Sequence, residues 1–295
     1  MTLSVLIPTY NYCATELVET IDELISREAI EAEIVVADDA SPVPATWMDE
    51  LCCSNSLTLY RAPHNLGRAA IRNQLASLAR GTWLWFIDCD TALATSFSLQ
   101  CYLDNAGAAD VLCGGITTPD KPPAGASLRF RYERADSSRR STEARSREPY
   151  RQLSTCNLFI KKSVFTEIMF CEDIKNYGYE DALFGVELEK LHASISHIDN
   201  PIVHLGLESN DVFLAKTEVA LQTLRTLEGR MNGNSRLQET AHRLQRWKLD
   251  GAVRLLYRLF RKAMRSNLLS DKPSLRVFSM YKLGFYLSQG SPVGN

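Results

Sequence analysis

The first ninety residues alternate short apolar runs with amphipathic helical patterns, and this alternation restricts the fold more than any other feature. Residues 15–26 and 65–80 have apolar side chains at helical spacing. Short apolar runs predict four strands, at residues 3–8, 33–38, 57–61 and 82–88, and the run at 33–38 is rich in β-branched residues. Strands that alternate with helices form mainly parallel sheets through right-handed crossovers. The sequence therefore predicts an α/β fold with a Rossmann-like, mainly parallel sheet.

Polar clusters follow three of these strands. They are Thr9-Tyr10-Asn11 directly after Pro8, the pair Asp38-Asp39, and the pair Asp88 and Asp90. Ligands of open α/β sheets bind outside the carboxyl ends of the strands, so the topology is expected to bring these clusters together.

Asp88 and Asp90 come directly after the apolar run Trp83–Ile87. Residues two apart on a strand point to the same side, so both carboxylates are expected to face one spot. Two like charges there raise one pKa unless a cation neutralises them. A hard divalent ion with oxygen ligands is the natural occupant, and the pair predicts such a site.

The Asp38-Asp39 cluster is suited to a nucleotide base. A base N–H can donate to a carboxylate while the base stacks on an aromatic ring such as Tyr10. Arg72, on the helix of residues 65–80, could reach a phosphate or the base. It could equally form an ion pair with Asp39 that fixes the helix to the sheet.

Two further sites lie in the second half of the chain. Glu180 and Asp181 begin a helix, where the dipole favours ionised carboxylates and where a general base for a hydroxyl could stand. Charge complementarity to the helix end alone would also explain them. His204 could be a core residue, or it could complete a metal shell with Asp88 and Asp90, which suits Mn²⁺ slightly better than Mg²⁺.

Regularity weakens after Gly115. Residues 119–151 are rich in Pro, Ser and Arg and are expected to form a mobile loop or lid, or a solvated insertion without a role. A strand is expected at residues 153–161, and a strand pair around Pro201.

The net charge of −2 is unevenly distributed. Residues 230–276 contain twelve Lys and Arg against three Asp and Glu, a net of +9. Residues 236–265 predict a basic amphipathic helix or helix pair that caps the catalytic domain, forms an oligomer contact, or lies on an anionic membrane surface; we favour the membrane. Nucleic-acid binding is not expected, because few stacking aromatics are interleaved with the basic residues.

Composition indicates a cytoplasmic protein. The N-terminal residues lack the basic region and the small-residue cleavage site of a signal peptide, and no apolar run reaches membrane-spanning length. The eight cysteines include no C-x-x-C pair and are expected to be reduced thiols.

Six segments, in this order, resemble family 2 glycosyltransferases of the GT-A fold: "SVLIPTYN", "VVADDAS", "HNLGRAAIRN", "WLWFIDCDTAL", "NYGYED" and "VHLG". The resemblance covers about residues 1–215. The later half is similar to the acceptor-side segment of bacterial chondroitin-polymerase-type and β-1,4-galactosyltransferase-like enzymes. Relatives often have glycine after the acidic pair, where this chain has Ala40.

The resemblance implies a role for each matched residue. The donor nucleotide sugar would be bound by Pro8, Thr9, Tyr10, Asp38, Asp39, Arg72 and Asp88. Mn²⁺ or Mg²⁺ would be bound by Asp88, Asp90 and His204, with Asp90 as the more direct ligand. Asp181 would be the catalytic base, and the acceptor side would include Asn157, Tyr179 and Glu180.

The implied activity is metal-dependent, inverting transfer of a sugar from a nucleoside diphosphate, with UDP as the expected nucleotide, to a hydroxyl of a glycan or lipid-linked glycan. Capsule or lipopolysaccharide synthesis is the expected setting, at the inner face of the cytoplasmic membrane through a peripheral contact of the basic C-terminal helix.

The expected domains are a catalytic domain at 1–228, divided into a nucleotide half (1–115) and an acceptor half (116–228), and a helical region at 229–295. A non-catalytic glycan-binding or scaffold module is the alternative. A nucleotidyltransferase would need a glycine-rich loop after the first strand, and "PTYNYCAT" contains no glycine.

Overall fold

The computed structural model describes residues 2–135, 141–231 and 233–289, and they form two compact units. We call them the sheet unit and the helical unit. The sheet unit comprises the described parts of 1–119, 137–175 and 180–206, and the helical unit those of 120–136, 176–179 and 207–295. The domain boundary expected at residue 228 stays a prediction.

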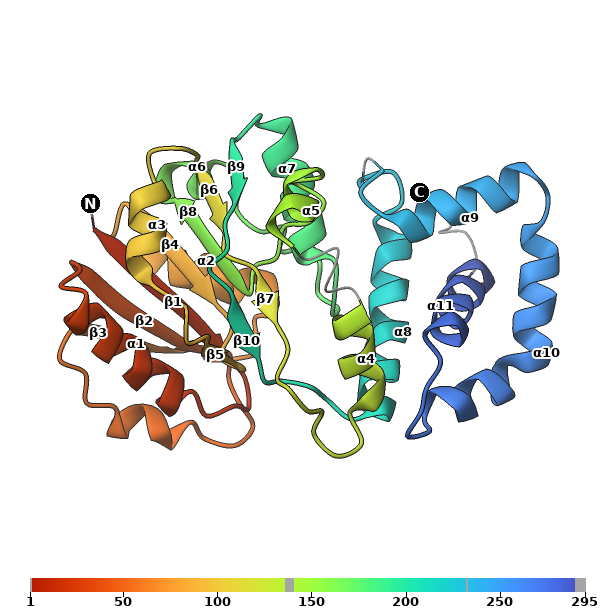
Figure 1. Ribbon diagram of the computed structural model, residues 1–295, viewed down its shortest axis with the longest axis horizontal. Helices are drawn as coiled ribbons and strands as arrows, with labels where there is room; N and C mark the ends of the chain where they lie inside the picture. Colours follow the sequence, from red (N-terminus) through yellow and green to blue (C-terminus); the bar gives the residue numbers. More distant parts are fainter. Residues whose placement is uncertain (1, 136–140, 232, 290–295) are drawn as a thin grey trace. The chain divides into compact units, whose positions relative to one another are not determined.

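The sheet unit is built on a seven-stranded sheet in the order β3-β2-β1-β4-β8-β6-β9 (Figure 1). Strand β8 runs antiparallel to both of its neighbours, and all other pairs are parallel. The predicted α/β class with a mainly parallel sheet is confirmed. The strands are β1 (Leu3–Thr9), β2 (Ala32–Asp38), β3 (Ser56–Arg61), β4 (Trp83–Ile87), β6 (Val111–Cys113), β8 (Asn157–Lys161) and β9 (Ile195–His197).

Helices cover both faces of this sheet. One apolar core contains alternate strand residues packed with α1 (Thr15–Arg27) and α3 (Leu99–Asn105). The other core contains the intervening strand residues, packed with α2 (Arg68–Leu78), α6 (Lys162–Ile168) and α7 (Glu180–Lys190). Two short helices complete the unit, the 3₁₀ helix η1 (Thr46–Glu50) and α5 (Thr142–Ser146).

Strand β4 explains the apolar run before the D-x-D sequence. It lies between β1 and β8, and all five of its residues are buried. Trp85 packs in the core of α1 and α3, whereas Phe86 packs in the opposite core. A strand covered on both faces is apolar at every position instead of alternating.

A second, three-stranded sheet contains β5 (Thr91–Leu93), β10 (Ile202–His204) and β7 (Ile116–Thr117), in the order β5-β10-β7. Strand β10 pairs antiparallel with β5, and His204 lies opposite Thr91. The strands predicted around Pro201 are β9 and β10, which belong to different sheets. The pairing of β10 with β5 brings His204 beside the D-x-D turn.

The helical unit contains α4 (Ser127–Ala135), α8 (Asn210–Thr226), α9 (Arg236–Arg246), α10 (Asp250–Leu268) and α11 (Leu275–Ser288). Within it, α11 lies between α8 and α10 (Figure 1). The basic segment at 236–265 is a helix pair, one of the two predicted forms. Within the described ranges, none of the helices combines the length and apolar character needed to span a bilayer.

The prediction of an irregular loop over residues 119–151 is wrong for much of that range, because helices α4 and α5 lie within it. Tertiary contacts that the local sequence does not reveal stabilise both helices. The Asn210 side chain accepts a hydrogen bond from the backbone N–H of Leu128 at 2.7 Å. Arg145 of α5 is buried and donates to the carbonyl oxygens of Cys113 and Ile198, each at 2.8 Å. Residues 136–140 lie outside the described residues.

Candidate functional site

The carboxyl ends of β1 and β2 are joined by a chain of hydrogen bonds. Asp38 accepts hydrogen bonds from the backbone N–H and the hydroxyl of Ser41. That hydroxyl oxygen in turn accepts the backbone N–H of Asn11 at 2.6 Å. Thr9 is buried and donates to the carbonyl of Tyr12 at 2.7 Å, whereas Tyr10 is half exposed. These contacts hold both loops in place and leave the Tyr10 ring at the surface.

Ala40 occupies a backbone position that favours glycine. Its φ is +56°, in the left-handed region that costs an L-residue roughly 1–2 kcal/mol. The turn between Asp38 and Ser41 requires this conformation, because the side chain of Asp38 bonds back to Ser41.

Asp39 binds the start of helix α2. Its two carboxylate oxygens accept the backbone N–H groups of Leu66, at 2.6 Å, and Gly67, at 3.0 Å. Burial raises the pKa of Asp39, and the neighbouring charge of Asp38 adds to the effect. The alternative ion pair between Arg72 and Asp39 is wrong, because backbone groups of the helix start occupy Asp39 and the Arg72 guanidinium binds other carboxylates.

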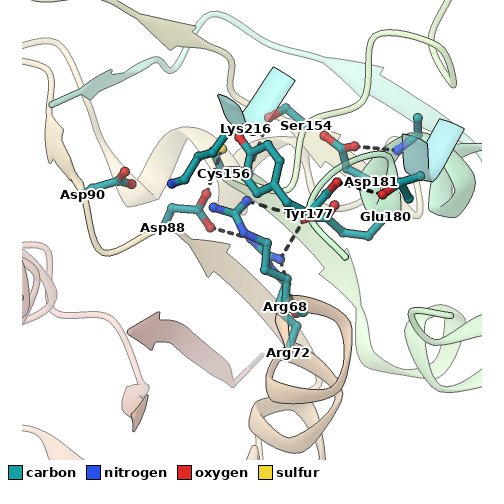
Figure 2. A network of polar contacts seen from close by, with 12 residues as sticks. Arg68, Arg72, Asp88, Asp90, Ser154, Cys156, Tyr177, Glu180, Asp181 and Lys216 are labelled. Carbon is teal, nitrogen blue, oxygen red and sulfur yellow. Dashed lines mark hydrogen bonds and ion pairs between the residues drawn. The ribbon is translucent and has the colours of Figure 1, made fainter. Parts of the chain in front are cut away.

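Arg72 links the end of β4 to the start of α7 (Figure 2). It is buried, and its guanidinium lies 2.7 Å from Asp88 Oδ1 and 3.5 Å from Glu180 Oε1. Arg68, one turn earlier on α2, also lies 3.5 Å from Glu180 Oε1. A buried guanidinium is stable only with such counter-charges.

Asp88 has a second partner, the thiol of Cys156, which lies 3.0 Å from Asp88 Oδ2. Burial disfavours the charged form of Asp88, but Arg72 and Arg68 outweigh it and lower the pKa to about 2. Burial, together with the charge of Asp88, raises the pKa of the Cys156 thiol, so it stays protonated and donates. Asp88 is therefore an ionised carboxylate that is already neutralised by protein groups.

Asp90 has different surroundings. Its carboxylate Oδ2 lies 3.5 Å from Nε2 of the buried His204, and its carbonyl accepts the backbone N–H groups of Leu205 and Gly206 at 2.8 and 3.1 Å. The expectation that Asp88 and Asp90 face one spot is wrong, because β4 ends at Ile87 and the alternation of strand side chains ends with it. Asp88 is directed to Arg72, and Asp90 to His204.

Asp90 and His204 fit a shared divalent ion, because a carboxylate oxygen and an imidazole nitrogen lie side by side at a partly exposed position. Among the described residues, no group of three His, Cys, Asp or Glu side chains forms a complete metal cage. Further ligands would come from water and substrate oxygens, which is typical of Mg²⁺ and Mn²⁺.

Gly206 makes this arrangement possible. A Cβ at this position would lie 1.9 Å from Asp90 Oδ2, far inside contact distance. The segment after β10 can therefore approach Asp90 only with glycine there.

Glu180 and Asp181 are adjacent in sequence but differ in environment. Glu180 is buried between Arg68 and Arg72. Asp181 accepts the backbone N–H of Ala182 at 2.7 Å, and no ion pair to it is present in the described part of the chain. Burial, together with the charge of Glu180, raises the pKa of Asp181 to about 6. A carboxylate with this pKa is suited to accept a proton near neutral pH.

Asn157 and Tyr179 are the two other residues expected on the acceptor side. Asn157 is buried under the sheet end, where its side chain accepts from Trp85 and Tyr102 and donates to the carbonyl oxygens of Gly115 and Asn200. Both its oxygen and its nitrogen are used in these contacts, which join the sheet to neighbouring loops, and its role on the acceptor side stays a prediction. Tyr179, which has a φ of +68°, belongs to the helical unit.

Sequence reasoning missed three residues of this network: Arg68, Cys156 and Gly206. Arg68 could have been found, because it lies four residues before Arg72 and therefore on the same helix face. The thiol of Cys156 and the close approach of Gly206 depend on contacts between distant segments, which local patterns do not reveal.

A profile of the family described as Glycosyl transferase family 2 matches residues 4–169, more than half of the chain. The chain belongs to glycosyl transferase family 2. It is therefore a glycosyltransferase that uses a nucleotide sugar, and the predicted family is confirmed. The match includes the Asp38-Asp39 turn, Arg72 and the D-x-D sequence, and it ends before Glu180, Asp181 and His204.

Solved structures support the same fold. The mannosyltransferase PcManGT from Pyrobaculum calidifontis, in complex with GDP-Man and Mn²⁺, has a TM-score of 0.55 at 14% identity, over 97% of this chain and 84% of that chain. S. aureus TarS has a TM-score of 0.52 at 18% identity, over 96% of this chain and 54% of TarS. At these identities the likeness shows a GT-A-like fold alone. A search of curated proteins found no match.

The strained turn gives the first testable prediction. Ala40→Gly should raise the free energy of unfolding by about 0.5–1 kcal/mol, because glycine adopts the left-handed conformation without steric cost. Ala215→Gly, at an exposed position inside α8, is the control and should lower it by a similar amount. Urea unfolding measures both, and a less stable Ala40→Gly protein would contradict the proposed strain.

The buried arginine gives the second prediction. Arg72→Ala should lower the free energy of unfolding by about 3–5 kcal/mol, because it leaves Asp88 and Glu180 without their buried counter-charge. Arg68→Ala removes a half-exposed arginine and should cost less than about 1 kcal/mol. Equal losses in urea unfolding of the two variants would show that the network does not depend on Arg72.

Proposed function

We propose that the protein is an inverting, metal-dependent glycosyltransferase that moves a sugar from a nucleoside diphosphate to a hydroxyl of a glycan or lipid-linked glycan, with Asp181 as the base. One observation carries the proposal. Arg68 and Arg72 neutralise Glu180, whereas the neighbouring Asp181 has a backbone N–H as its hydrogen-bond donor and a raised pKa. The protein thus holds one carboxylate of the pair ready to take a proton.

The donor is proposed to bind at the carboxyl ends of β1, β2 and β4. The exposed ring of Tyr10 offers a stacking surface for the base, next to Pro8 and Thr9. Asp39 holds the helix start with both oxygens, yet each carboxylate oxygen can accept a second hydrogen bond, here from the base. Asp38 shapes the turn beside it.

We propose UDP as the nucleotide. The TarS structure in complex with UDP-GlcNAc aligns over 97% of this chain with a TM-score of 0.50, whereas PcManGT is bound to GDP-Man. The sequence-level similarity of the later half to chondroitin-polymerase-type and β-1,4-galactosyltransferase-like enzymes favours a UDP-hexose or UDP-hexosamine. Synthesis of a cell-surface polysaccharide would fit such a donor.

Asp90 and His204 would hold Mn²⁺ or Mg²⁺, which when bound supplies positive charge for the departing diphosphate. Asp88 would contribute indirectly, by fixing Arg72 and the turn that presents Asp90. This division follows from the partners of each carboxylate and makes Asp90 the more direct ligand.

The transfer is proposed as a single displacement. The acceptor oxygen forms a bond to the anomeric carbon while the bond from that carbon to the diphosphate oxygen breaks. Asp181 takes the acceptor hydroxyl proton, and the nucleoside diphosphate leaves with the bonding electrons. Glu180, held by two arginines, would position the acceptor beside Asp181.

The base assignment predicts a pH-dependent rate. Because only ionised Asp181 accepts a proton, kcat/KM should rise about tenfold per pH unit below about pH 6 and level off above it. Asp181→Asn should lower kcat by about 10²–10⁴-fold and remove this dependence. Release of UDP from a panel of UDP-sugars, measured with Mn²⁺ and a glycan acceptor, checks both.

A stability measurement separates loss of the base from misfolding. Burial raises the pKa of Asp181 in the folded state, so its ionisation opposes folding above about pH 6. Asp181→Asn should therefore be at least as stable as the unsubstituted protein at pH 8. Donor binding without turnover by the unsubstituted protein would instead indicate a non-catalytic module.

The metal assignment predicts an effect of Gly206. Gly206→Ala should weaken Mn²⁺ binding by about tenfold or more, because the new Cβ displaces Asp90 from His204. Gly107→Ala, where a Cβ meets nothing within 4 Å, is the matched control and should bind Mn²⁺ normally. Titration calorimetry with Mn²⁺ measures both, and unchanged affinity in Gly206→Ala would contradict the site.

A further inference from the structure

Helix α10 presents an apolar face that nothing in the described part of the chain covers. Its inner side packs on α11, where the Tyr257 ring lies 5.4 Å from that of Tyr281 and Leu268 is buried. Its outer side exposes large apolar side chains, roughly half or more of each: Leu255 (53%), Leu256 (47%), Leu259 (65%) and Phe260 (51%).

These side chains form continuous rows. Leu255 and Leu259 are four residues apart, as are Leu256 and Phe260, so each pair stacks on one side of the helix. The two rows are adjacent and make a single apolar stripe. Such a stripe on a helix that also has a buried side is a second apolar surface, which the internal packing of the unit does not use.

Basic side chains form the neighbouring rows. Arg254, Arg258 and Lys262 are spaced four residues apart directly beside the apolar stripe, and the next row contains Arg261 and Arg265. Asp250 pairs with Arg254, and Glu218 with Arg265. Arg258 and Lys262 form no ion pair with any residue that the structure describes.

We propose that α10 is a docking surface for a membrane that contains anionic phospholipid. The helix would lie parallel to the bilayer, with its leucines and Phe260 in the headgroup region and its basic heads on lipid phosphates. Its 19 residues span about 28 Å, which allows the whole stripe to contact one flat surface. Each basic residue near such a surface strengthens binding roughly fivefold.

The charge of the basic row favours an anionic membrane over a second copy of the chain as the partner of this surface. In a two-fold contact between α10 helices, the stripe of one copy faces the same stripe of the other. In the antiparallel form of this contact, the row of Arg254, Arg258 and Lys262 borders the same side of the stripe in both copies, so the two rows would approach each other as like charges. An anionic bilayer meets the same rows with opposite charge.

The inference goes beyond the proposed function and does not depend on it, because membrane binding requires neither donor nor turnover. Its test therefore uses vesicles alone. The full chain is incubated with phosphatidylcholine vesicles, with or without about 30 % phosphatidylglycerol, and the bound fraction is measured by flotation.

We expect binding to the anionic vesicles and little to phosphatidylcholine alone. Leu255→Gln/Leu259→Gln should weaken binding by about tenfold or more, since both side chains enter the interface. Val212→Gln/Met280→Gln changes two similarly exposed apolar residues outside α10 and should bind normally. Arg258→Gln/Lys262→Gln should also weaken binding and reduce its salt dependence.

Three results would overturn the proposal. The first is absence of vesicle binding by the unsubstituted chain. The second is binding that Leu255→Gln/Leu259→Gln does not weaken, which would indicate a purely electrostatic surface such as one for a nucleic acid. The third is a dimer, measured by sedimentation, that this variant dissociates while vesicle binding is unchanged.

Discussion

The buried guanidinium of Arg72 is the interaction on which the candidate site depends. It lies between Asp88, delivered by the end of β4, and Glu180, delivered by the start of α7. Without these carboxylates, a buried positive charge on Arg72 would be strongly unfavourable. Without Arg72, the buried negative charges of Asp88 and Glu180 would be equally unfavourable. The three elements are therefore held in one relative position. The turn after β4 that carries Asp90 and the first turn of α7 that carries Asp181 both begin at that fixed point.

The site contains two carboxylate pairs, and each pair is divided in the same way. Arg72 neutralises Asp88, while Asp90 lies beside His204 at a partly exposed position. The two arginines of α2 neutralise Glu180, while Asp181 keeps a raised pKa. In each pair protein groups neutralise one member, and the other is the one that we propose for the chemistry. Environment, rather than residue type, makes this difference.

The helical unit adds a different property. Its α10 packs on α11 with its inner side, and its outer side combines an exposed apolar stripe with a basic flank. A glycosyltransferase that acts on lipid-linked glycans would benefit from such a surface, because binding to the bilayer confines enzyme and acceptor to two dimensions. The vesicle test and the kinetic tests address these two roles separately.

The sequence alone determined the sheet, the family and the position of the polar clusters, because burial periodicity and parallel topology are written in local patterns. It also indicated the helix pair at 236–265. Tertiary contacts decided which carboxylates are neutralised by arginine, since Arg72 pairs with Asp88 and Glu180 and not with Asp39. They also made helices of much of residues 119–151, through the partners of Leu128 and Arg145. Local spacing reports which face of a helix or strand is apolar, but not which side chains of distant segments pair. For this reason the pairing within the site could not be predicted from the sequence.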